Sequence, residues 1–174
     1  LYMVNHGLAT GLLFLVVGML VARRGSALVT DFGGAGKLLP VLAGVLLFAG
    51  LASLALPGTA PFASEFLVLV GTYTANRPVA VVATLGIILA AAYVLWMVQR
   101  TTQGRLNPAL SEVPAMRKDI SFRESVVVAP LIALIVLFGF YPKPLLDVIN
   151  PAVTATLQDV GRSDPAPEAQ EAQP

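Results

Sequence analysis

The chain has 174 residues, of which 56% are hydrophobic and only 12% are charged, and its formal net charge at pH 7 is +1. Soluble domains carry about 25% charged residues, so the composition predicts an integral membrane protein. Cysteine is absent, which excludes a disulfide framework, a thiolate metal site and a cysteine nucleophile. The near-neutral balance also lacks the long basic run expected of a nucleic-acid-binding protein.

The first candidate membrane helix is an apolar segment over residues 2–22, which ends at Arg23 and Arg24. Its length fits the requirement of about 20 apolar residues for one membrane helix. Residues 23–37 then form a polar loop. The chain starts at Leu1 with no basic region or cleavage signature, which argues against a signal peptide. We expect the chain to be the C-terminal piece of a longer protein.

A long apolar stretch follows over residues 38–73, interrupted by Pro57, Gly58 and Pro61. Proline removes a backbone N–H, and glycine permits unusual backbone angles. The pattern therefore predicts two helical pieces joined near the Pro-Gly pair. Pro61 suits the first turn of the second piece, and Thr59 is a candidate cap for it.

The remainder of the chain predicts two more membrane helices and a tail. Its elements are a short loop at 75–78, a helix at 79–100, a polar loop at 101–121 and a helix at 122–141. Residues 144–174 form a C-terminal tail, which we expect to be disordered from about residue 162 because Pro, Ala, Gln and Glu dominate there. We therefore predict an all-α polytopic transmembrane bundle over residues 1–143. It has about four membrane-crossing segments, and one of them is discontinuous.

The distribution of basic residues favours a single crossing for the 38–73 stretch. One crossing places loops 23–37 and 101–121 on the same side of the membrane, and two crossings would place them on opposite sides. The basic residues of these two loops are Arg23, Arg24, Lys37, Arg105, Arg117 and Lys118, with Arg100 and Arg123 at the loop edges. The positive-inside rule then predicts that both loops are cytoplasmic in a bacterial cell membrane and that the C-terminus lies outside. Because 36 residues is long for one span, the pieces must tilt or protrude.

Glu65 carries the clearest functional signal in the sequence. It lies in the apolar stretch four residues after Pro61, at a depth where an ionisable group costs about 2.5 kcal/mol or more. The dipole of the second helical piece favours the charged carboxylate, and burial disfavours it, so Glu65 is suited to gaining and losing a proton. The alternative is a structural ion pair, but the visible apolar segments offer no basic partner.

A second group of polar residues could carry protons beside Glu65. His6 lies in the first apolar segment, and Thr10 is one turn further on the same face. A histidine can relay protons near neutral pH, or it can simply bond a neighbouring helix; both readings remain open. Thr84 and Tyr93 could hydrate a path, although packing is the commoner role of such residues.

The sequence indicates no bound cofactor or metal. Gly33, Gly34 and Gly36 lack the preceding strand and the following helix that a phosphate-binding loop requires. There is no paired carboxylate constellation, metal-ligand cluster or Ser/His/Asp arrangement. We therefore expect this chain to hold no cofactor of its own.

Four blocks of the sequence form a recognisable set over residues 1–148, namely NHGLATGLLFLVVGML, ARRGSALVTDFGG, LASLALPGTAPFASEFLVLVG and LFGFYPKPLLD. In their order and spacing they resemble the C-terminal part of the chain M family of antiporter-like subunits in the bacterial proton-pumping NADH–quinone oxidoreductase (respiratory complex I). In this family, His6 matches the histidine of the central polar axis, and Glu65 matches the last glutamate of the broken helix. Sister subunits have Lys at the position of Glu65, so the glutamate favours chain M.

The resemblance implies a proton-translocating membrane subunit without a redox centre. NADH, FMN, the iron–sulfur clusters and quinone would belong to partner subunits, and the nearest partners in the bilayer would be other antiporter-like subunits. The family's further proton-path residues would lie upstream of Leu1. Ala60-Pro61 and Ala63-Ser64 depart from the commoner GxxGFxGEF pattern, which affects the start of the helix and leaves the carboxylate in place.

Two alternatives stay open at this stage. The same fold serves multisubunit cation/proton antiporters and membrane-bound hydrogenases, so the chain could belong to one of these. A non-conducting membrane scaffold is the third reading, against which the presence of both His6 and Glu65 argues.

Overall fold

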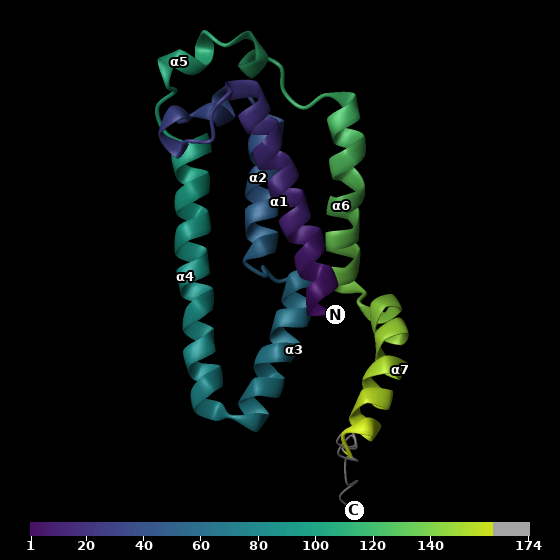
Figure 1. The fold of residues 1–174 in the computed structure, drawn as a ribbon. Coiled ribbons are helices and arrows are strands. Elements are labelled where there is room, and N and C mark those ends of the chain that lie inside the picture. The colour runs from purple at the N-terminus through teal and green to yellow at the C-terminus, as the bar shows by residue number, and fades with distance from the viewer. Residues whose placement is uncertain (162–174) are drawn as a thin grey trace, which may run out of the picture.

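The computed structural model describes residues 1–161, which form a bundle of helices without strands in that range (Figure 1). Its longer helices are α1 Tyr2–Arg24, α2 Pro40–Ser53, α3 Ala60–Ala75, α4 Arg77–Thr102, α6 Phe122–Phe140 and α7 Lys143–Asp159. Short helical turns occur at Val29–Asp31, Ala35–Lys37, Pro108–Ser111 (α5) and Pro114–Arg117. Three helices, α1, α4 and α6, are long and apolar enough to cross a membrane, and α2 is a shorter apolar helix. The predicted all-α membrane bundle is confirmed.

The predicted helix break is present between α2 and α3. Residues 54–59 leave the helical path, with φ of +55° at Ala55 and +93° at Gly58. Pro61 lies in the first turn of α3, where a missing N–H costs no hydrogen bond. Figure 1 shows α2 and α3 continuing in the same direction along the bundle. Together they form one discontinuous helix.

The predicted cap at Thr59 is wrong. Thr59 occupies the position before α3, but its side chain makes no hydrogen bond to the helix. The hydroxyl donates instead to the carbonyl of Leu56 at 2.7 Å, and the Thr59 N–H donates to the same carbonyl at 3.0 Å. The hydroxyl therefore closes the turn within the break.

The loop predicted at 75–78 is also shorter than expected, because α4 begins directly after Asn76. The Asn76 side chain accepts a hydrogen bond from the Val79 N–H at 3.2 Å. Pro78 fits the first turn of α4. A cap and a proline that both favour a helix start thus reduce the connection to Asn76.

The two loops that were expected on one side of the membrane lie together at one end of the bundle (Figure 1). The N–H groups of Gly33 and Gly34 donate to the carbonyls of Thr101 and Gln103 at 3.2 and 2.9 Å. A Cβ on Gly34 would lie 2.7 Å from the backbone of Leu106, so only glycine fits this close approach. The glycine-rich loop caps the end of α4.

The same end is held by three charged side chains. The Arg23 guanidinium donates to both carboxylate oxygens of Glu124 at 2.8 and 2.7 Å, and to the carbonyls of Lys118 and Asp119. The Asp119 carboxylate accepts from two N–H groups at the start of α2, at 2.8 and 3.0 Å. These contacts join α1, α2 and α6 at the polar end.

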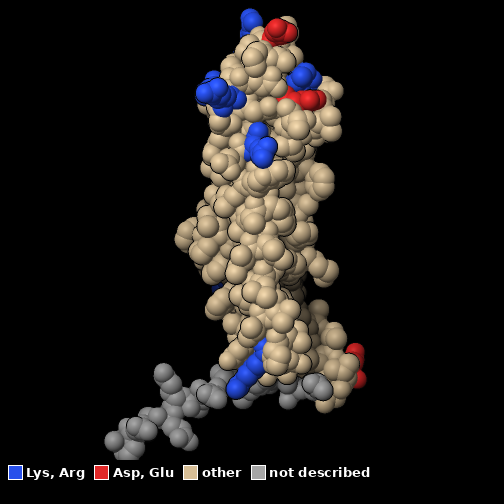
Figure 2. Space-filling model, turned by 90° about the vertical axis from the view of Figure 1, so that its left-hand side faces the viewer, with Lys and Arg blue, Asp and Glu red and all other residues tan. Residues whose placement is uncertain are grey.

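Apolar side chains fill the interior and also cover the outside. The buried face of α1 includes Leu12 and Val16, which pack in one cluster with Leu42 and Leu46 of α2. Many large apolar side chains remain exposed, including most of those on α4. Figure 2 shows the charged side chains gathered toward the two ends of the face that α4 forms, with a broad uncharged band between them. This pattern fits contact with lipid or with other apolar surfaces.

The structure adds one helix that the sequence analysis did not assign. α7 follows α6 after Tyr141 and Pro142 and covers the first part of the expected tail. The division at residues 143 and 144 stays a prediction. The expected disorder from about residue 162 lies outside the described residues.

Candidate functional site

Glu65 lies on α3, five residues beyond the start of the helix at Ala60. Its side chain is half-buried. The ion pairs within residues 1–161 are Arg23–Glu124 and Lys143–Asp147. Glu65 therefore has no basic partner in the described part of the chain.

The Glu65 side chain borders a cavity of about 500 Å³ between the helix break, α3 and α4. The other lining residues are apolar: Leu51, Leu54, Ala55, Leu56, Pro57, Phe62, Phe66, Leu69, Ile87, Ala91 and Leu95. A charge in such surroundings is costly unless it is paired or hydrated. The carboxyl group is therefore placed where taking up a proton removes a substantial penalty.

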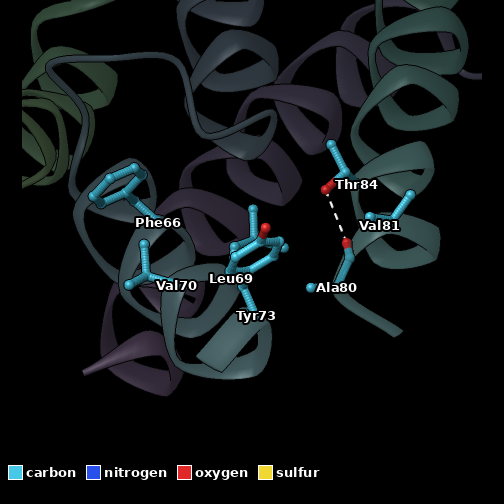
Figure 3. A pocket seen from close by; sticks show the side chains of 7 residues that line it. All are labelled: Phe66, Leu69, Val70, Tyr73, Ala80, Val81 and Thr84. Atoms are coloured by element: carbon cyan, nitrogen blue, oxygen red, sulfur yellow. Dashed lines mark hydrogen bonds between the residues drawn. The ribbon is translucent and has the colours of Figure 1, made fainter. Parts of the chain in front are cut away.

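A second cavity of about 340 Å³ continues between α3 and α4, away from the break. Figure 3 shows Phe66, Leu69, Val70 and Tyr73 of α3 opposite Ala80, Val81 and Thr84 of α4. Phe66 and Leu69 line both cavities. The Thr84 hydroxyl donates to the carbonyl of Ala80 at 2.9 Å, so its proton is used within its own helix. Its suggested part in a hydrated path stays a prediction.

His6 and Thr10 lie on the outer side of α1 and contact each other. The Thr10 hydroxyl lies 3.3 and 3.4 Å from the two ring nitrogens of His6, as their spacing predicts. The ring of Tyr2 stacks on that of His6, with 5.9 Å between centroids and 9° between planes. No hydrogen bond joins His6 to Glu65 among the described residues, so the structure does not bring the two predicted proton carriers into direct contact.

Tyr2 is a polar neighbour that the sequence analysis missed. Its ring stacks on that of His6 near the start of α1. Tyr93 is exposed on α4 and is not among the residues that line the Glu65 cavity. The spacing of four residues between Tyr2 and His6 was the available signal, since residues one turn apart share a helix face.

Asn5 is a second residue that the sequence analysis missed. Its side chain is fully buried, and Nδ2 donates to the Ala60 carbonyl at 2.8 Å and to Ser64 Oγ at 3.2 Å. Its Oδ1 atom is buried and has no hydrogen-bond partner among residues 1–161. The signal was an amide inside an apolar helix, next to the histidine that drew attention.

The backbone of the break is covered by the end of α6. A Cβ on Gly139 would overlap the Gly58 carbonyl oxygen and would lie 2.7 Å from the Thr59 carbonyl carbon. The ring of Phe140 lies over Gly58, 3.3 Å from where a Cβ would stand. Non-helical backbone at membrane depth requires protein or water around it, and α6 supplies part of that cover at Gly58 and Thr59.

Within residues 1–161 no group of three or more His, Asp or Glu side chains is arranged to hold a metal ion. The described residues thus offer a carboxyl group, a histidine, hydroxyl groups and a buried amide. The carboxyl group and the histidine can bind and release protons, and all of these groups can hydrogen-bond water. The roles assigned to Glu65, His6, Thr10 and Tyr93 stay predictions.

Comparison with a protein family and with known proteins finds similarity to membrane subunits of NADH:quinone oxidoreductases. Residues 1–90 match the family described as "NADH:quinone oxidoreductase/Mrp antiporter, TM". The chain is 47% identical over 167 residues to an NADH-quinone oxidoreductase subunit M of Mycobacterium tuberculosis strain H37Rv, covering 96% of this chain and 30% of that protein.

Two further relatives are also named as subunits of this kind of oxidoreductase. The chain is 38% identical over 157 residues to an NADH-quinone oxidoreductase subunit M of Rhodobacter capsulatus, covering 90% of this chain and 30% of the relative. It is 39% identical over 158 residues to an NADH-ubiquinone oxidoreductase chain 4 of Arabidopsis thaliana, covering 91% of this chain and 31% of that protein. The chain spans about three tenths of the length of these curated relatives.

Proposed function

Because the chain belongs to the NADH:quinone oxidoreductase/Mrp antiporter membrane family, we propose that it acts as part of a proton-translocating membrane subunit of an NADH–quinone oxidoreductase. The relatives support this reading, since those compared above are named as subunits of NADH-quinone or NADH-ubiquinone oxidoreductase. The chain would couple quinone reduction in other subunits to proton movement across the membrane. NADH, FMN, iron–sulfur clusters and quinone would be bound by partner subunits.

The single observation that carries the proposal is the position of Glu65. It follows a helix break, has no basic partner among residues 1–161, and borders an apolar cavity. Discontinuous helices are a recurring way to build ion sites within membranes. Glu65 would take up and release the proton, and His6 with Thr10 would pass protons to it through hydrated polar groups.

The charge distribution supports one orientation of the subunit in the membrane. Arg23, Lys37, Arg105 and Lys118 belong to the end of the bundle where the two long loops meet (Figure 1). The positive-inside rule supports a cytoplasmic location for that end in a bacterial cell membrane. Its neighbours would be other antiporter-like subunits and the lipid bilayer.

The proposal is tested with Glu65→Gln in the full-length subunit, within its assembled complex in sealed vesicles. NADH:quinone turnover and proton uptake are recorded together. Both should fall steeply, because glutamine keeps the shape of the side chain and cannot exchange a proton. Glu112→Gln is the matched control, because Glu112 is exposed in the loop at the polar end. Wild-type turnover and uptake in an assembled Glu65→Gln complex would overturn the proposal.

The family description also covers Mrp antiporters, and the same preparation separates the two readings. Purification of the intact complex with flavin and iron–sulfur subunits supports the oxidoreductase. Sodium/proton exchange by a complex that lacks those subunits would instead make the chain part of an antiporter. A scaffold role would leave both activities unchanged in Glu65→Gln.

A further inference from the structure

The strongest unexplained feature of the described chain is the side chain of Asn5. An amide that is fully buried in an apolar helix normally satisfies all of its hydrogen-bonding groups. Asn5 satisfies its donors through Ala60 and Ser64 and leaves Oδ1 without a partner among residues 1–161.

The hydrogen-bond network fixes the orientation of this amide. The Ser64 hydroxyl donates to the Pro61 carbonyl at 3.0 Å, so its oxygen accepts from Asn5. The Ala60 carbonyl can only accept. Both contacts of Asn5 therefore require its NH₂ group, and turning the amide over would place Oδ1 against another acceptor. The oxygen therefore has no donor among residues 1–161 and needs one from elsewhere.

The position of these contacts gives Asn5 influence over Glu65. The chain leaves the helical path at residues 54–59, so helical hydrogen bonds do not hold α3 to α2. The two bonds from Asn5 are the hydrogen bonds that join α1 to α3 within the described residues. They hold the first residue of α3 and the residue directly before Glu65.

We propose that Asn5 is a positioning residue that sets the orientation of Glu65 by fixing the start of α3, and that its Oδ1 binds one water molecule beside the helix break. This inference rests on the proposed function, because it assigns Asn5 a part in proton transfer at Glu65. The water supplies the donor that the amide oxygen lacks, as buried waters commonly do for buried polar groups. It also places a hydrogen-bonding molecule in the same helical turn as His6, on the inner side of α1.

The test uses infrared spectroscopy on the assembled complex, with the carboxyl stretching band of Glu65 identified by its loss in Glu65→Gln. In Asn5→Leu the apparent titration midpoint of that band should move by about half a pH unit or more, about a threefold change in proton affinity. A water O–H band that shifts in H₂¹⁸O should be present in the unmodified complex and absent from Asn5→Leu. Asn150→Leu is the matched control, because Asn150 is exposed on α7 and should leave both bands unchanged.

Ser64→Ala separates the two parts of the inference. It removes one acceptor of the Asn5 amide and leaves Oδ1 in place, so the Glu65 midpoint should move while the water band remains. This milder variant also provides the measurement if Asn5→Leu fails to assemble. An unmoved midpoint in Ser64→Ala and Asn5→Leu overturns the positioning role, and a retained water band in Asn5→Leu overturns the water site.

A failure of this inference can be told apart from a failure of the proposed function. The infrared bands report on Glu65 and water whether or not protons pass through the subunit. If Glu65→Gln loses activity but the bands are unchanged in Asn5→Leu and Ser64→Ala, only the role of Asn5 is refuted. Changed bands together with a fully active Glu65→Gln complex would remove the proposed function and leave Asn5 as the residue that orients a non-essential carboxyl.

Discussion

Gly139 of α6 lies against the carbonyl group of Gly58 so closely that no methyl group fits between them. The obstacle is backbone, which cannot rotate away as a side chain would. The contact places the end of α6 directly on the discontinuous helix, at the level where residues 54–59 leave the helical path.

Gly139→Ala should therefore destabilise the subunit. The added methyl group forces α6 away from the break, and overpacking of this kind costs about 1–3 kcal/mol. The measurement is the thermal stability of the assembled complex, together with proton uptake in vesicles. Gly86→Ala in α4 is the control, because a Cβ there meets nothing within 4 Å. It should be neutral or stabilising by up to about 1 kcal/mol, and equal behaviour of the two variants would contradict the close contact.

Arg23→Gln should destabilise the polar end of the bundle. The Arg23 guanidinium holds Glu124 with two short hydrogen bonds, and the two side chains are only 11% and 19% exposed. Losing charged hydrogen bonds in this partly buried setting should cost about 1–3 kcal/mol. Thermal unfolding of the purified complex measures the loss.

The second ion pair is the control for Arg23. The Nζ atom of Lys143 lies 2.6 Å from Oδ2 of Asp147, one turn further along α7, but both side chains are more than half exposed. Exposed pairs of this type contribute about 0.5 kcal/mol or less and weaken with salt. Lys143→Gln should therefore leave the thermal unfolding temperature almost unchanged. If it lowered that temperature as much as Arg23→Gln does, the partly buried pair would not be the stronger of the two.

Asp119→Ala should loosen the start of α2. Its carboxylate accepts hydrogen bonds from the Val41 and Leu42 N–H groups, which lack partners within the helix. Removing such a cap costs about 0.5–2 kcal/mol. Hydrogen exchange at the first turn of α2 should become faster, while exchange in α4 stays the same. Unchanged protection at Val41 and Leu42 would show that the carboxylate does not cap the helix in the membrane.

His6→Gln should slow coupled turnover more than Thr10→Val does. Under the proposed function the imidazole carries the proton, and positioned acid–base groups contribute on the order of a hundredfold or more to proton-transfer rates. Thr10 contacts the ring through one hydroxyl group, so its loss should disturb the orientation of His6 and leave the imidazole in place. NADH:quinone turnover as a function of pH measures both effects. Equal activity of His6→Gln and the unmodified complex would remove His6 from the path.

The sequence was sufficient to predict features that act locally along the chain. Pro57 and Gly58 change the backbone at their own positions, so a break there can be predicted without knowledge of the neighbours. The membrane helices follow from long apolar runs for the same reason. Glu65 was found because a carboxyl group inside such a run is costly wherever the helix packs.

The features that escaped prediction depend on contacts between distant segments. Asn5 reaches Ala60, 55 residues away, and nothing in the sequence of α1 identifies that acceptor. Gly139 meets Gly58 through the packing of α6 against the break. The helix α7 lies in the segment that was predicted only as a tail, and Pro144 fits its first helical turn.

The 26-residue helix α4 runs unbroken beside the jointed α2–α3 pair (Figure 1). It meets α2 near Gly50, where a Cβ would lie 2.8 Å from Val94 Cγ1, and it faces α3 near Tyr73. A straight rod attached on both sides of a joint acts as a splint: it fixes the distance between the far ends of the two pieces. A change of angle at the joint would therefore have to displace α4 as well, and α4 supplies Ile87, Ala91 and Leu95 to the cavity beside Glu65.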